Sequence, residues 1–326
     1  MRAVVCRQYG PPELLVVEER PVPVIDDDQV LIAVRAAGVN FPDTLIIQGK
    51  YQVKPAVPFV PGGEVAGVVE KVGPGVSGVA EGDRVVALAP FGGFAEYVTA
   101  SAMQLVPMPA GLDFERAASA LTTYGTSQYG LMDRAQLRGG ETLLVLGAAG
   151  GVGLAAVELG KMLGARVIAA ASSAEKLATC TKYGADAVID YSKEDLKDRV
   201  KALTGGAGAD VVCDPVGGAL TEAALRATAW NGRLLVVGFA TGEIPKIPAN
   251  LTLLKGASVM GVFWGAWLMR DPEAARARHT ELLQWISDGK LSPHVFGRYP
   301  LASAAQALRD VLERRVVGKA VLMVSS

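Results

Sequence analysis

The chain has 326 residues, half of them hydrophobic, and its 32 lysines and arginines nearly balance its 33 aspartates and glutamates. This length suits about two domains with a large core, and the balanced charge excludes the electrostatic signature of a protein that binds nucleic acid or an anionic membrane. The N-terminus lacks the apolar core of a signal peptide, and no apolar run approaches the roughly 18 residues that span a bilayer, so we expect a soluble cytoplasmic protein.

Residues 1–120 are predicted to be rich in β-structure. Short strands are expected at 3–6, 14–18, 30–36, 67–72 and 84–88, separated by turns of proline and glycine. Strands spaced so regularly are typical of a partly open barrel or a strongly bent sheet. A helical pattern begins at Phe114.

The stretch 142–153 reads Thr-Leu-Leu-Val-Leu-Gly-Ala-Ala-Gly-Gly-Val-Gly, which predicts a buried strand, a tight turn and the start of a helix. A dinucleotide pyrophosphate needs such a turn, because it lies almost on the backbone and binds the N–H groups of the helix start. We assign the turn to Gly147, the approach of the phosphates to Gly150 and Gly151, and close packing of helix and strand to Gly153. Ala149 replaces the second glycine of the usual fingerprint, so an ordinary glycine loop is the alternative.

The residues after the next predicted strand, 166–171, indicate which dinucleotide binds. An NAD-binding domain usually has an acidic residue there, which holds the ribose 2′-hydroxyl. Here the strand is followed by Ser172 and Ser173, and Lys176 comes one helical turn later. Hydroxyls and an ammonium would bind a 2′-phosphate, so the sequence favours NADPH over NADH. The alternative is that the serines only cap the next helix and Lys176 is solvated.

Strands and helices alternate through the second half of the chain, which predicts a doubly wound parallel sheet. The expected helices are 154–163, 175–183, 193–203 and 220–228, and the expected strands are 166–171, 187–190, 209–214, 232–238 and 258–262. Two longer helices, 272–288 and 300–313, precede a strand at 319–324. Because that strand lies outside the alternating region, we expect it to return to the first domain.

Six ordered motifs are spread along the chain. They are Ala37-Gly38-Val39-Asn40-Phe41-Pro42-Asp43, Pro61-Gly62-Gly63-Glu64-Val65-Ala66-Gly67, Glu81-Gly82-Asp83-Arg84-Val85, Gly92-Gly93-Phe94-Ala95-Glu96-Tyr97, Ala148-Ala149-Gly150-Gly151-Val152-Gly153 and Gly318-Lys319. With these motifs the chain resembles the medium-chain dehydrogenase/reductase superfamily, and within it the zinc-independent quinone oxidoreductases. The resemblance implies an α/β protein: a GroES-like β-rich catalytic domain (1–122 and 264–326), an inserted Rossmann NADPH-binding domain (123–263), and an active site in the cleft between them.

The same comparison indicates that no metal takes part. Zinc alcohol dehydrogenases of the superfamily carry Cys where this chain has Asn40 and His where it has Gly63. A catalytic zinc needs about three side-chain ligands, which Glu64 alone does not supply. His279 and His294 are the two histidines of the chain, and both are expected at the surface. The three cysteines, Cys6, Cys180 and Cys213, lack metal or redox spacing and are expected to be buried thiols in a reducing compartment.

Without a metal, hydride from a nicotinamide must go to an acceptor that is already electron-poor, such as a quinone or a C=C bond conjugated to a carbonyl or thioester. Addition to such a C=C bond leaves an enolate that needs a proton. Tyr51 matches a tyrosine of related enoyl-thioester reductases and is the candidate donor or hydrogen-bond clamp. Asn40 and Asp43 are expected close to the nicotinamide or the acceptor oxygen. The alternative for Tyr51 is a packed aromatic ring at a loop edge.

The resemblance implies further cofactor contacts, for each of which ordinary packing at a strand end is the alternative. Thr122 and Asn40 are expected near the nicotinamide ribose, Tyr191 over the adenosine phosphate, Val152 in the glycine loop, Phe239 with Phe263, Trp264 and Gly265 at the nicotinamide, and Lys319 approaching from the C-terminal strand. Strand 258–262 is expected to pair with its copy in a homodimer, although an edge buried within one chain would have the same composition.

The sequence therefore favours an NADPH-dependent, metal-free quinone reductase. One alternative is a reductase of enoyl or acrylyl thioesters or of 2-haloacrylate-type acids. The other is a noncatalytic NADPH-binding protein, as the crystallins of this family illustrate.

Overall fold

The computed structural model describes residues 1–324; residues 325 and 326, which end the predicted catalytic domain, lie outside the described residues. The chain divides into two compact units, one formed by Met1–Thr122 with Asp271–Ser326 and the other by Thr123–Arg270. The predicted domain boundary placed residues 264–270 with the catalytic domain, whereas helix α9 (Trp264–Arg270) falls in the Thr123–Arg270 unit. No helix within residues 1–324 is long and apolar enough to cross a membrane.

The first unit is rich in β-structure, as predicted. Its strands are β1 (Arg2–Cys6), β2 (Leu15–Glu19), β3 (Gln29–Val39), β4 (Glu64–Val72), β5 (Arg84–Leu88), β6 (Tyr97–Ser101), β7 (Leu105–Pro107), β14 (Val295–Pro300) and β15 (Lys319–Met323). Its helices are α1 (Phe41–Ile46), α2 (Phe114–Ala117), α10 (Pro272–Ser287) and α11 (Ala304–Leu312), with the 3₁₀ turns η1 (Pro12–Leu14), η2 (Ala102–Gln104) and η4 (Leu301–Ser303). The main sheet has the order β14-β15-β3-β4-β5-β7, and β1 pairs with β2.

Strand β3 organises this unit. It is apolar and almost wholly buried, and its register against β4 shifts at two places, between Leu31 and Ile32 and between Val34 and Ala36. Such irregularities bend a strand, so the first half of β3 pairs with β6 and the second half with β15. The bent sheet and the return of the C-terminal strand were both predicted from the sequence.

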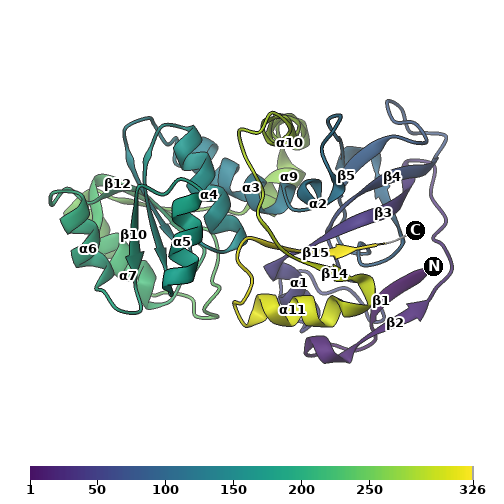
Figure 1. Ribbon diagram of the computed structural model, residues 1–326, viewed down its shortest axis with the longest axis horizontal. Helices are drawn as coiled ribbons and strands as arrows, with labels where there is room; N and C mark the ends of the chain where they lie inside the picture. The colour runs from purple at the N-terminus through teal and green to yellow at the C-terminus, as the bar shows by residue number, and fades with distance from the viewer. Residues whose placement is uncertain (325–326) are drawn as a thin grey trace. The chain divides into compact units, whose positions relative to one another are not determined.

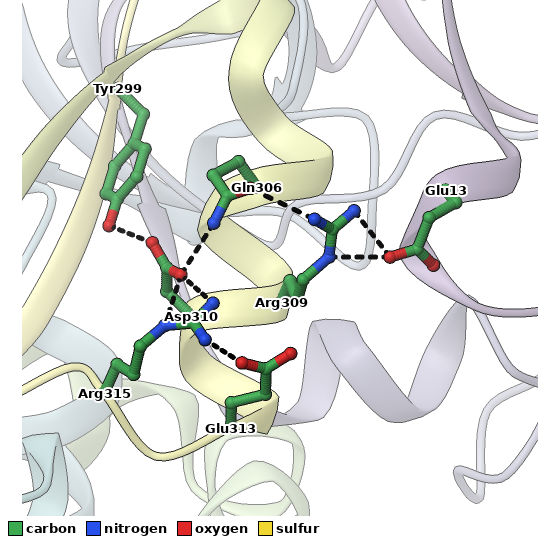
Figure 2. A network of polar contacts seen from close by, with 7 residues as sticks. All are labelled: Glu13, Tyr299, Gln306, Arg309, Asp310, Glu313 and Arg315. Atoms are coloured by element: carbon green, nitrogen blue, oxygen red, sulfur yellow. Dashed lines mark hydrogen bonds and ion pairs between the residues drawn. The ribbon is translucent and has the colours of Figure 1, made fainter.

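A partly exposed polar network centred on the buried Asp310 holds helix α11 in the same unit (Figure 2). The Tyr299 hydroxyl at the end of β14 donates to Asp310 on α11 over 2.7 Å, and the Arg315 guanidinium donates to the same carboxylate through Nε over 2.8 Å. Arg309 on the same helix binds Glu13 of η1. Burial acts to raise the pKa of Asp310, but the hydrogen bonds from Tyr299 and Arg315 outweigh it and lower the pKa.

The second unit holds a six-stranded parallel sheet. Its strands are β8 (Thr142–Leu146), β9 (Arg166–Ala171), β10 (Ala187–Asp190), β11 (Ala209–Asp214), β12 (Thr228–Val236) and β13 (Ser258–Gly261). Its helices are α4 (Gly151–Met162), α5 (Ala174–Lys182), α6 (Leu196–Leu203), α7 (Ala219–Arg226), α8 (Ala249–Lys255) and α9. Helix α3 (Leu121–Gln128) begins in the first unit and continues into the second, where the π-helical turn η3 (Tyr129–Arg134) follows it.

The strand order β10-β9-β8-β11-β12-β13 confirms the predicted doubly wound sheet. The central strands are apolar on both faces because helices cover both: α4 and α5 lie on one side of the sheet and α6 and α7 on the other (Figure 1). The order reverses between β8 and β11. Sheets of this type bind ligands where the order reverses, at the carboxyl ends of the strands.

One surface prediction was wrong. His279 lies on the buried face of α10 with Ala275, Leu282, Leu283 and Ile286, and only 4% of it is exposed. These buried positions recur at helical spacing. The prediction was wrong because it considered the histidine alone and not this pattern. Burial lowers the pKa of His279 to about 4, so the imidazole is neutral at physiological pH. The other histidine, His294, is half-buried.

Candidate active site and cofactor site

Three neighbouring strands of the first unit bring chemically active residues to one end of the sheet. Lys319 begins β15, Asn40 follows β3, and Glu64 begins β4, while β15 and β4 flank this half of β3. Asn40 is the N-cap of α1 and Pro42 lies in its first turn, a combination that favours helix initiation and ends the strand at this point. Asn40 and Lys319 were predicted as site residues; Glu64 was not.

The three side chains form one buried network. The Lys319 ammonium donates to Asn40 Oδ1 over 2.5 Å, to Val39 O over 3.2 Å and to Glu64 Oε2 over 3.3 Å. Asn40 Nδ2 donates to Glu64 Oε2 over 2.9 Å, and the Thr122 backbone N–H donates to Glu64 Oε1 over 3.0 Å. Lys319 is 4% exposed and Glu64 is fully buried, so this is an ion pair shielded from solvent.

A glycine lets the Thr122 segment approach the network. A Cβ on Gly38, the residue opposite Glu64 in the sheet, would lie 2.0 Å from Ala118 O and 3.0 Å from Glu64 Oε2. Any side chain there would push the segment outward and separate Thr122 from the carboxylate. The motif glycine therefore determines the geometry of the site.

Asp43 and Tyr51 lie beside the network. The Asp43 carboxylate accepts the Asn40 backbone N–H over 2.8 Å and is almost fully buried. Burial raises the pKa of Asp43 to about 7; the Asn40 N–H and the Lys319 charge oppose this change, and the Glu64 charge adds to it. Burial, followed by the nearby charge of Asp43, raises the pKa of Tyr51. Tyr51 therefore stays protonated, which a proton donor requires.

In the second unit, the glycine turn leads into α4 as predicted. Gly150 is the N-cap in an extended conformation, and no side chain caps the helix. The N–H groups of a first helical turn, here from Gly151 to Gly153, have no partner within the helix. A helix start of this kind binds an anion, and α4 has 12 residues, long enough for a full dipole.

The glycines of this turn differ in which atoms a side chain at each position would contact. Gly147 has a positive φ of 55°, and a Cβ there would lie 2.8 Å from Val216 in the loop after β11. A Cβ on Gly153 would lie 2.3 Å from Gly147 O, so this glycine packs helix against turn. At Gly150 a Cβ would meet only Gly147 O, at 3.3 Å, which leaves its other side open to a ligand. The residues fit the pyrophosphate of a dinucleotide.

Backbone hydrogen bonds gather the other predicted residues of this unit at the same edge. The N–H of Ala148 in the glycine turn donates to Ala170 O over 3.0 Å, which holds the turn against the end of β9. The N–H of Tyr191 donates to Ala171 O over 3.1 Å, so Tyr191 lies beside the strand tip from which Ser172 extends.

The polar groups at this tip suit a phosphate. Ser173 caps α5, accepting the Lys176 backbone N–H over 3.4 Å, as the capping interpretation predicted. This cap uses the backbone N–H of Lys176 and is compatible with a phosphate contact at the same tip. Asp190, at the end of the neighbouring strand β10, binds Ser192 over 2.5 Å and Lys193 over 3.3 Å. These contacts with Ser192, and next with Lys193, lower the pKa of Asp190 despite partial burial.

The remaining predicted residues lie in the loops after β12 and β13. Phe239 is 36% exposed and packs on Gly217 of the loop after β11. Phe263 is 60% exposed, while Trp264 and Gly265 begin α9 and the Trp264 ring packs on Gly125 of α3, 3.1 Å from where a Cβ would lie. The structure thus brings the Rossmann-side residues to one edge and the Asn40, Asp43, Tyr51, Thr122 and Lys319 set to one end of the other sheet.

Two buried carboxylates beside the predicted site residues were missed from the sequence. Glu64 begins β4 directly before the apolar run 65–69, a pattern that signals a partnered buried charge. Asp214, 1% exposed at the end of β11, accepts the N–H groups of Val216 and Gly217 over 2.8 and 2.9 Å and shapes the loop where the strand order reverses. Within residues 1–324, no group of three or more His, Cys, Asp or Glu side chains is placed to hold a metal ion.

Comparisons with known proteins agree with this architecture. Residues 26–110 match the family model of the alcohol dehydrogenase GroES-like domain, and residues 151–287 match that of the zinc-binding dehydrogenases. The chain is 42% identical over 325 residues to quinone oxidoreductase-like protein 2 homolog of Nematostella vectensis, covering 98% of this chain and 88% of that protein.

Two solved structures extend the likeness to three dimensions. Escherichia coli quinone oxidoreductase complexed with NADPH has a TM-score of 0.91 and 30% identity, covering 99% of this chain and 100% of the other. A mycobacterial protein complexed with NADPH has a TM-score of 0.93 and 36% identity at the same coverage. The chain therefore belongs to the zinc-independent quinone oxidoreductase family of the medium-chain dehydrogenase/reductase superfamily, as its motifs predicted.

Proposed function

We propose that this protein is an NADPH-dependent, metal-free oxidoreductase that transfers hydride to a quinone or a similarly electron-poor acceptor. The observation that carries the proposal is the open helix start at Gly150–Gly153, which lies on the same sheet edge as the hydroxyl and ammonium groups of Ser172, Ser173 and Lys176. The NADPH complexes of the E. coli and mycobacterial relatives support the cofactor, and the names of several relatives support the quinone.

Bound NADPH supplies a hydride, so that a quinone, NADPH and one proton give a hydroquinone and NADP⁺. In our proposal the first turn of α4 binds the pyrophosphate, and Lys176 with the serines binds the 2′-phosphate. Tyr51, kept protonated by burial and by Asp43, donates the proton or a hydrogen bond to the acceptor oxygen. Where zinc dehydrogenases have metal ligands, this chain has the amide of Asn40 and, at Gly63, no side chain. This difference supports chemistry without a metal.

We further propose that the Thr123–Arg270 unit is the cofactor-binding domain and the other unit the catalytic domain. A homodimer formed through β13 and residence in a reducing cytoplasm complete the proposal. The buried, free state of Cys6, Cys180 and Cys213 supports the reducing compartment.

A stacked ring pair favours a flat acceptor over a long thioester. Tyr129 of η3 and Trp267 of α9 stack with centroids 4.6 Å apart and planes 13° apart. The pair is a rigid apolar surface in the same unit as Phe263 and Trp264, the residues predicted at the nicotinamide.

Steady-state oxidation of NADPH tests the function, with 1,2- and 1,4-quinones compared with crotonyl-CoA, acrylyl-CoA and 2-haloacrylates. We expect quinones to have the highest kcat/KM and EDTA treatment to leave the rate unchanged. Faster turnover of a thioester or haloacrylate would establish a C=C reductase instead. Tight NADPH binding without turnover of any acceptor would establish a noncatalytic binding protein.

A further inference from the structure

The Lys319 ammonium has no hydrogen left for a ligand. An ammonium has three N–H donors, and those of Lys319 point to three protein oxygens: Val39 O, Asn40 Oδ1 and Glu64 Oε2. With 4% of the side chain exposed, contact with a cofactor would require breaking one of these buried bonds. This geometry differs from the cofactor contact that the family resemblance implies for Lys319.

The Glu64 carboxylate is likewise committed to the protein. Oε1 accepts the backbone N–H of Thr122, and Oε2 accepts both Asn40 Nδ2 and the Lys319 ammonium. Glu64 and Lys319 thus hold the side chain of Asn40, and Glu64 also holds the backbone at Thr122. Asn40 and Thr122 are both expected at the nicotinamide.

The pair also determines which way the Asn40 amide faces. Its oxygen lies against the ammonium and its nitrogen against the carboxylate, and a flip would place like groups together at both contacts. The second Nδ2 hydrogen reaches only Gly38 O at 3.5 Å, the limit of a hydrogen bond. Asn40 can therefore offer a ligand one Nδ2 hydrogen, while its oxygen binds the Lys319 ammonium.

We infer that Glu64 and Lys319 are a positioning pair that fixes Asn40 as a hydrogen-bond donor and anchors Thr122, and that neither residue binds the cofactor. The inference rests on the proposed function, because it assigns Asn40 and Thr122 to the reacting end of that site. An amide N–H held in this way orients and polarises a carbonyl oxygen, such as that of a quinone or of the nicotinamide carboxamide.

A double-mutant cycle tests the inference with Glu64→Gln, Lys319→Met and the combined variant, in the full-length protein. Each single change leaves one buried charge without its counter-ion, whereas the double change removes both. We expect each single variant to lower kcat at saturating NADPH and quinone at least ~10-fold, and the double variant to regain part of the lost Tm. The Kd for NADPH, measured by fluorescence titration, should stay within ~3-fold of the wild-type value in Lys319→Met.

Asp310→Asn is the matched structural control. It removes a buried charge from the network of Figure 2 in the same unit, so it should lower Tm while leaving kcat and the Kd for NADPH unchanged. If the Glu64 and Lys319 variants also lower Tm without changing kcat, the role of these residues is only structural and the inference fails.

Two further results would overturn the inference. An increase of ~10-fold or more in the Kd for NADPH in Lys319→Met, without recovery in the double variant, would make Lys319 a direct cofactor ligand. Additive Tm losses in the double variant would show that the two residues are not coupled. Absence of turnover by the wild-type protein would refute the proposed function, whereas the Tm cycle and the NADPH titration would still decide the role of the pair.

Discussion

Lys176 lies in the first turn of α5, where its backbone N–H is bound by the Ser173 cap, and α5 follows the tip of β9. A 2′-phosphate is the one charged group that NADPH has and NADH lacks. Lys176→Ala should therefore raise the Kd for NADPH ~10–100-fold, the loss of about one charge-assisted hydrogen bond, and leave the Kd for NADH almost unchanged.

Fluorescence titration with both nucleotides measures this difference. Lys182→Ala, an exposed lysine in the last turn of the same helix, is the control and should change neither value. Equal losses for the two nucleotides in Lys176→Ala would contradict a 2′-phosphate contact.

Asp43 makes the stability of the fold depend on pH. Its pKa rises to about 7 in the folded protein from an ordinary value of 3.8, so the folded state holds a proton that the unfolded state has released. Stability then falls as the pH rises from about 4 to about 7. Asp43→Asn removes this effect, and its stability relative to the wild type should increase by on the order of 2–3 kcal/mol between pH 5 and pH 8.

Urea unfolding at the two pH values gives the measurement. Asp310 has the opposite effect on stability. Its pKa is lowered on folding, so its contribution to the free energy of unfolding is present at neutral pH and is lost at acidic pH. A constant difference between Asp43→Asn and wild type across the range would mean that the carboxyl is ionised throughout.

At the scale of elements, most strands and helices were predictable because their signals are local. The boundaries of β5, β9, β10 and β11 match the prediction residue for residue, since runs of Val, Ile and Ala between glycine turns leave few alternatives. Helix α6 begins at Leu196 and not at 193, because Asp195 caps it by accepting the Asp198 N–H. Strands β6, β7 and β14 and helices α1, α8 and α9 were not predicted; each is short or has a mixed pattern.

The glycine turn allows two effects to be separated by mutation. Gly153→Ala places a methyl group 2.3 Å from Gly147 O, so the helix start must shift, and both Tm and NADPH affinity should fall. Gly150→Ala has a permitted φ of −74° and one contact at 3.3 Å, so it should keep Tm within about 2 °C of the wild type while weakening NADPH through contact with the phosphates.

Thermal unfolding and NADPH titration on both variants test this distinction. Unchanged NADPH affinity in Gly150→Ala would mean that the pyrophosphate lies elsewhere than at this turn.

At the scale of the whole molecule, β13 ends the parallel sheet and has one neighbour, β12. Exposed apolar side chains occur in the flanking segments: Leu253 and Leu254 on α8, and Met269 on α9. An unpaired edge with such surroundings is a favourable site for strand pairing between copies. The protein should therefore have a mass twice 33.9 kDa in solution.

Size-exclusion chromatography with light scattering tests the assembly. Met260→Lys on β13 places two like charges near each other across a two-fold axis and should yield monomers. Met103→Lys, at a residue 66% exposed on η2, is the control and should remain dimeric. A monomeric wild type would refute the assembly.

The sequence by itself determined the doubly wound sheet, the β-rich unit, the family and the glycine turn, because hydrophobic periodicity and glycine spacing act within a few residues along the chain. It did not place His279 in a core or identify Glu64, because these depend on which elements pack together. Only the tertiary structure decided that Glu64 joins Asn40, Thr122 and Lys319, which lie 24, 58 and 255 residues away in sequence. The role of a charge buried at a strand end depends on its partners, which the bent strand β3 brings together here from distant parts of the chain. A pattern of neighbouring residues carries no information about such partners.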